Sequence, residues 1–133
     1  PPDVDTGIVS RGVKAAMGEL PIIALLPFES DGRHTEVALE AGAVAVSLAP
    51  PRVLLPAENG FVSGRLYGRA VFPLLLGKVQ RLIREQVPVI AGGGVYTGQQ
   101  AESLLRLGVK AVQLDAVLWR EPEIKLSLSD ELP

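Results

Sequence analysis

The sequence VPVIAGGGVYT occupies residues 87–97. Its first part, Val87–Ala91, consists of apolar residues and runs into three consecutive glycines, which is typical of a buried strand followed by a tight turn. Thr97 and Gln100 then fit the capping box that begins a helix. The stretch therefore predicts a strand, a glycine turn and a helix, which together make the basic unit of α/β proteins.

Three more short apolar segments, each bounded by Gly or Pro, predict further strands: Leu20–Leu26, Ala43–Leu48 and Val109–Leu114. Helical periodicity precedes the first strand, in residues 7–20, and lies between the strands in residues 36–42, 69–85 and 97–108. Pro73 suits the first turn of the helix 69–85, and Gly42 and Gly108 suit helix ends. This alternation predicts an α/β fold of parallel (β/α) units, with a long loop between the second strand and residue 69.

Two segments of the chain are related by an internal repeat. Glu36–Leu48 reads EVALEAGAVAVSL and Glu102–Leu114 reads ESLLRLGVKAVQL, with identical residues at six of thirteen positions. The repeat has two explanations. Any helix–strand unit packs small residues at such points, so the similarity can reflect packing alone. Alternatively, the two units belong to a quasi-symmetric barrel. A whole (β/α)₈ barrel needs about 250 residues. The 133 residues and four strands therefore predict half of a TIM barrel.

Composition excludes several classes of protein. The 47% hydrophobic residues supply a core, and the absence of Cys excludes disulfides, iron–sulfur clusters and a thiol nucleophile. A net charge of −2 without a basic patch argues against nucleic acid as a partner. No apolar run approaches the roughly 18 residues of a transmembrane helix. We expect a cytoplasmic protein, since an absence of Cys favours a reducing compartment.

The ends of the chain carry two expectations. The sequence starts at Pro1 and its only Met is Met17, which indicates a processed chain or a piece of a longer one. We expect residues 1–120 to form the half barrel and residues 121–133 to form a tail. The tail is either a short added strand, on the alternation of Ile124, Leu126 and Leu128, or a loose end.

Two glycine-rich stretches are candidates for a phosphate site. Gly92, Gly93 and Gly94 precede a helix, where backbone N–H groups can hold an oxyanion, although a tight turn without a ligand needs the same residues. The second stretch, NGFVSGR at 59–65, offers Gly60, Ser63 and Gly64 on the predicted loop, and an ordinary surface loop is the alternative.

Other polar and aromatic residues carry weaker signals. His34 is expected to cap a helix rather than to act in catalysis, and Glu29 and Asp31 follow a strand end, where active sites of barrels lie. Tyr67 and Tyr96 suit either ring stacking or packing, and Trp119 suits packing or an interface. No catalytic residue and no metal ligand set is predicted.

Residues 60–118 resemble the C-terminal half of class 1 and class 2 dihydroorotate dehydrogenases, and a looser similarity reaches back to Pro21. The matching features are the loop at 60–64, Pro73 in the first turn of a helix, the strand ending in glycines, the capped helix and the Val-Gln of the last strand. The resemblance implies an FMN-dependent (β/α)₈ barrel of pyrimidine biosynthesis. It places Gly93 and Gly94 at the FMN phosphate, with Gly60, Ser63 and Gly64 in the preceding loop.

The sequence departs from that family where the chemistry lies. Leu25 replaces a flavin-contacting Lys, Phe61 replaces a loop Gly, and Asp115-Ala116 replaces Gly-Thr beside the phosphate. Pro50-Pro51 replaces the substrate-contacting Asn-Thr, and the catalytic base of the family lies in the half that this chain lacks. A carboxylate beside a phosphate is repulsive. FMN is therefore a possible cofactor against which Leu25, Phe61 and Asp115 argue.

Three functions fit these residues. A half barrel that is non-catalytic by itself would serve as a structural or interaction module and pair with a second copy or a separate N-terminal half. An FMN-dependent oxidoreductase related to dihydroorotate dehydrogenase would include this chain as a fragment. A phosphosugar-binding barrel unrelated to flavins would need only the glycine turn.

Overall fold

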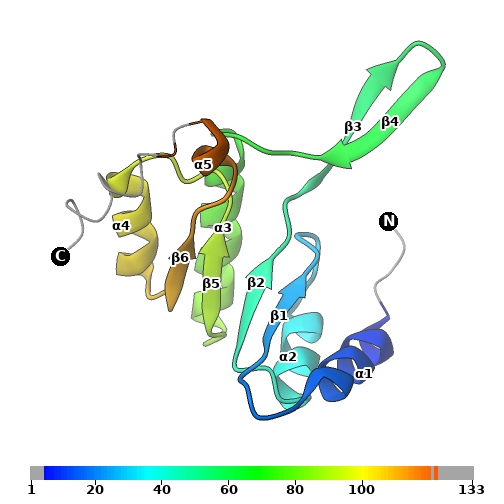
Figure 1. Ribbon diagram of the computed structural model, residues 1–133, viewed down its shortest axis with the longest axis vertical. Coiled ribbons are helices and arrows are strands. Elements are labelled where there is room, and N and C mark those ends of the chain that lie inside the picture. Colours follow the sequence, from blue (N-terminus) through cyan, green and yellow to red (C-terminus); the bar gives the residue numbers. More distant parts are fainter. Residues whose placement is uncertain (1–4, 121, 123–133) are drawn as a thin grey trace.

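The computed structural model describes residues 5–120 and 122 (Figure 1). Helices and strands alternate along the chain, as a (β/α) fold requires. Their order is α1 (Thr6–Ala16), β1 (Ile23–Leu26), α2 (Gly32–Glu40), β2 (Ala45–Leu48), β3 (Arg52–Ala57), β4 (Gly60–Arg65), α3 (Val71–Arg84), β5 (Val89–Gly92), α4 (Gly98–Leu107), β6 (Ala111–Gln113) and α5 (Ala116–Arg120).

Four strands form one parallel sheet in the order β1-β2-β5-β6. All four correspond to predicted strands, so the α/β fold of parallel (β/α) units is confirmed. Helices α3 and α4 cover the far face of the sheet in Figure 1, and α1 and α2 pack together beside β1. The open order of the sheet, with β1 and β6 at its two edges, is that of a barrel segment rather than a closed barrel.

The core lies between the sheet and its helices. Val46 and Val89 pair across the sheet and point into the core, where Leu75 and Leu82 of α3 and Leu104 of α4 are also fully buried. Each such side chain contributes about 1.5–3 kcal/mol of transfer free energy. This one-sided packing accounts for the helical spacing of apolar residues that predicted the two helices.

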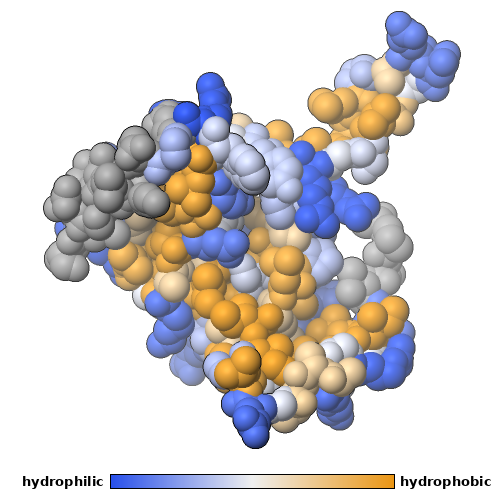
Figure 2. Space-filling view, viewed as in Figure 1, coloured by the Kyte–Doolittle hydropathy of each residue, from blue (hydrophilic) through white to orange (hydrophobic). Residues whose placement is uncertain are grey.

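The opposite face of the sheet is open. Because side chains alternate along a strand, Ile23 and Leu25 point away from the helices, and they are 50% and 65% exposed. Ala111 and Gln113 of β6 are exposed too. Figure 2 shows apolar side chains gathered on the side of the molecule that faces the viewer. This face corresponds to the interior of a barrel.

The predicted helix ends are largely confirmed. The Thr97 hydroxyl accepts the N–H of Gln100 at 3.2 Å, while the Gln100 side chain reaches one residue further back than in a capping box and accepts the N–H of Tyr96 at 2.8 Å. Gly108 ends α4 at a φ of 103°. Helix α2 starts earlier than the apolar pattern indicated, because Asp31 caps it at Gly32.

The predicted long loop was wrong, because its residues form an antiparallel hairpin of β3 and β4. The hairpin projects from the carboxyl end of the parallel sheet in Figure 1, and its twelve strand residues are all exposed except Val53. Residues 58 and 59 make its turn, and the N–H of Leu66 closes its base on the carbonyl of Pro51 at 2.8 Å. Alternation of polar and apolar residues is missing here, so the strands had no sequence signal.

The internal repeat has a structural counterpart. Gly42 and Gly108 both adopt positive φ, at 112° and 103°. Their N–H groups donate to the equivalent carbonyls of Leu39 and Leu105, at 3.0 and 2.9 Å. The two helix-to-strand turns are therefore built alike.

Of the predicted tail at 121–133, residues 121 and 123–133 lie outside the described residues, so the choice between strand and loose end stays a prediction. Among the helices that the structure describes, none is long and apolar enough to cross a membrane.

Candidate functional site

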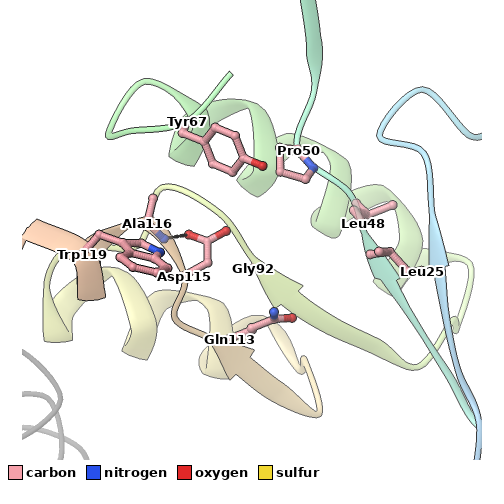
Figure 3. A pocket seen from close by; sticks show the side chains of 9 residues that line it. All are labelled: Leu25, Leu48, Pro50, Tyr67, Gly92, Gln113, Asp115, Ala116 and Trp119. Carbon is pink, nitrogen blue, oxygen red and sulfur yellow. Dashed lines mark hydrogen bonds between the residues drawn. The ribbon is translucent and has the colours of Figure 1, made fainter. Parts of the chain in front are cut away.

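A cavity of about 450 Å³ opens at the carboxyl end of the parallel strands (Figure 3). This is the edge where α/β barrels bind their ligands. Strands β1, β2, β5 and β6 and the segments that follow them supply the lining. The lining residues are Leu25, Leu48, Pro50, Tyr67, Gly92, Gln113, Asp115, Ala116 and Trp119.

Asp115 is the one charged residue among those nine. It follows β6, and its Oδ1 accepts the N–H of Ala116 at the start of α5, as Figure 3 shows. The N–H of Ala116 is therefore already hydrogen-bonded to this carboxylate. Lys and Arg are absent from the lining, as far as the structure describes the chain.

The three glycines of the predicted phosphate turn divide into two kinds. Gly92 lines the cavity and pairs with Gln113 of β6. Gly93 and Gly94 are buried at φ of 114° and 71°, and a Cβ on Gly94 would lie 2.4 Å from the backbone N of Phe72 in α3. The latter two glycines therefore permit close packing of the turn against the first turn of α3, and their predicted role at a phosphate stays a prediction.

Gly60, Ser63 and Gly64 lie in strand β4 rather than on a loop. They are exposed on the projecting hairpin and are not among the residues that line the cavity. The structure thus places the two predicted glycine-rich stretches on different elements, and the predicted role of these three residues in cofactor binding stays a prediction.

His34 lies in the first turn of α2, as expected. Its Nδ1 is 2.6 Å from Asp31 Oδ1, which also accepts the backbone N–H of His34 at 3.3 Å. The side-chain hydrogen bond with His34 holds the pKa of the Asp31 carboxyl below its usual range. Both residues therefore act at a helix end, away from the cavity.

Of the remaining candidate residues, some contact other parts of the fold and others line the cavity. Glu29 accepts the backbone N–H of Arg52 at 3.1 Å, and Arg69 lies 5.0 Å from the centre of the Tyr96 ring. Tyr67 and Trp119 line the cavity. Gln113 and Leu48 were not predicted as site residues, although both end strands at the carboxyl edge and their strand positions were a usable signal.

A second polar group lies away from the cavity, where Lys78 of α3 donates from Nζ to the carbonyl of Ser30. Burial lowers the pKa of this ammonium. Within residues 5–120 and 122, no group of three or more His, Asp or Glu side chains could hold a metal ion.

The cavity does not fit an anionic phosphate at its β5–β6 edge. An oxyanion there would meet the Asp115 carboxylate, and like charges at short range repel. The N–H of Ala116, which could otherwise donate to an oxyanion, already donates to Asp115 Oδ1. Leu25 and Leu48 add apolar surface without a donor.

Comparison with known proteins finds relatives that are longer than this chain. A dihydroorotate dehydrogenase (quinone) of Coxiella burnetii is 31% identical over 70 residues, which cover 50% of this chain and 20% of that protein. The catalytic subunit of dihydroorotate dehydrogenase B (NAD(+)) of Maridesulfovibrio salexigens is 34% identical over 141 residues, which cover 94% of this chain and 44% of that protein. The chain therefore spans less than half the length of these relatives.

The fold has solved counterparts. A ligand-free DHODH of Eimeria tenella matches with a TM-score of 0.68 at 19% identity, over 95% of this chain and 43% of that one. At that identity the match supports the fold alone. No family model matches the chain.

Proposed function

We propose that this chain, which is similar in sequence and fold to part of a dihydroorotate dehydrogenase-like TIM barrel, is non-catalytic by itself and acts as a structural or interaction module that pairs with another barrel half. One observation carries the proposal, namely the Asp115 carboxylate in the cavity at the carboxyl end of the strands, where no described residue adds a cation to the lining. The chain keeps the apolar residues that pack a barrel. At Asp115, however, a carboxylate would repel the phosphate that the resemblance implies.

The open sheet supports the pairing. Strands β1 and β6 each hydrogen-bond to one neighbour within the described part of the chain, and Ile23 and Leu25 expose apolar surface beside β2. Unpaired edges and exposed apolar faces favour association. A second copy, related by a twofold axis along the strands, would supply four more strands, and a separate N-terminal half would do the same.

Molar mass in solution tests the pairing. We expect light scattering on the purified chain to give a multiple of the 14.1 kDa monomer. Ile23→Asp places a charge on the open face and should yield monomers with an unchanged circular dichroism spectrum. Leu20→Asp, at an exposed position before β1, is the matched control and should leave the mass unchanged. A stable, monodisperse wild-type monomer would exclude pairing with a second copy and would show that the open edges of the sheet need no partner.

An FMN-dependent oxidoreductase that includes this chain as a piece is the second candidate. The names of the relatives and the position of Gly92 at the cavity favour it. It predicts flavin absorbance in the purified protein or a rise in melting temperature in excess FMN. Colourless protein without a melting shift would leave the non-catalytic module as the function.

A further inference from the structure

We propose that the carboxyl-edge cavity binds a small organic cation with a flat apolar body, such as an aromatic amidine or amine. The shape of the cavity is the first support. Its volume of about 450 Å³ lies in the range of small-molecule sites, which are mostly apolar with a few placed polar groups. Leu25, Leu48 and Pro50 form apolar lining, and Gln113 adds an amide.

The charge of the lining selects the sign of the ligand. Asp115 has no cationic neighbour among the nine lining residues, so a bound cation would supply the missing counter-charge. A carboxylate accepts charge-assisted hydrogen bonds from amidinium and ammonium groups. An anion would be repelled by the same carboxylate, and the N–H of Ala116 could not bind it because that group already donates to Asp115.

Two aromatic rings strengthen the preference for a cation. Tyr67 and Trp119 border the same cavity as Asp115, as Figure 3 shows, and their side chains are 53% and 91% exposed. The faces of such rings attract cations, and Trp does so most strongly. The exposed rings also present flat surface against which a planar ligand can stack. Cation, ring and carboxylate chemistry thus converge at one opening.

Ligand binding in this cavity goes beyond the pairing of barrel halves. The two are tested separately, because pairing is measured by molar mass and ligand binding by an NMR titration. Three probes share one ring and differ in charge: benzamidine, benzamide and benzoate. We expect benzamidine to bind about tenfold more tightly than benzoate in low salt, as a carboxylate contact and a ring contact together allow. Titration followed by protein NMR gives each affinity.

Asp115→Asn keeps the shape of the side chain and removes its charge, so it should bring the three affinities within about twofold of one another. Trp119→Ala should weaken benzamidine and benzamide together. Glu58→Gln, at the exposed turn of the hairpin, makes the same charge change outside the cavity and should leave the tenfold preference intact. NMR spectra report whether each variant is folded.

Three results would overturn the proposal. They are benzoate or inorganic phosphate binding as tightly as benzamidine, an unchanged preference in a folded Asp115→Asn variant, and absence of benzamidine binding to the wild-type chain at millimolar concentration.

Discussion

Gly94 combines two constraints in a single residue. Its φ of 71° disfavours a side chain, and a Cβ there would clash with the backbone of Phe72. Gly94→Ala should therefore lower the free energy of unfolding by about 3 kcal/mol, measured by urea denaturation. Gly77→Ala is the control, because Gly77 lies in α3 with open space around its Cα. There the same change should raise stability by about 0.5–1 kcal/mol.

Asp31 links the stability of α2 to pH. Its pKa in the folded chain is lowered by the His34 hydrogen bond, so the folded state favours the ionised carboxyl. The stabilisation is therefore present above the pKa of the unfolded chain, and it is lost as pH falls through the lowered folded value. We expect Asp31→Ala to be less stable than the wild type at pH 7, by a difference in melting temperature that shrinks as the pH is lowered through the acid range. A pH-independent difference would contradict this linkage.

Among the elements, the β3–β4 hairpin stands apart from the core. Its base closes between Pro51 and Leu66, so its ends lie close together, and its strands contribute nothing to the buried cluster. Replacing residues 52–65 with a short Gly-Ser linker should change the free energy of unfolding by less than about 1 kcal/mol. Leu82→Ala, within the core, should cost about 2–5 kcal/mol in the same assay. Loss of the cooperative transition on hairpin removal would show that the hairpin supports the fold.

The elements differ in how far the sequence could predict them. Helices α3 and α4 followed from apolar spacing, and the four parallel strands from short Val, Ile and Leu runs. The start of α2 was missed because Gly32–His34 has no apolar periodicity and only the Asp31 cap marks it. Helix α5 was not predicted because its five residues are too few to show a helical period. The hairpin was not predicted because β4 lacks an alternation of polar and apolar residues.

For the whole molecule, pairing through the open face makes stability depend on concentration. Association that exists only in the folded state raises the melting temperature as protein concentration rises. A hundredfold increase should raise the wild-type value by roughly 5 °C, and Ile23→Asp should abolish that rise. Scanning calorimetry at protein concentrations across this hundredfold range measures the change in melting temperature. A wild-type melting temperature that does not change with concentration would speak for a self-sufficient monomer.

The α/β class, the four strands and the glycines that end two of the helices follow from the amino-acid sequence alone. Periodicity, caps and left-handed turns are properties of neighbouring residues, so they can be read locally. Three other findings needed the folded chain: Gly94 packs against α3, Gly60, Ser63 and Gly64 lie on a projecting hairpin, and Asp115, Tyr67 and Trp119 border one cavity. Those relations join residues that are distant in the chain, and the packing of the sheet against its helices sets where they meet.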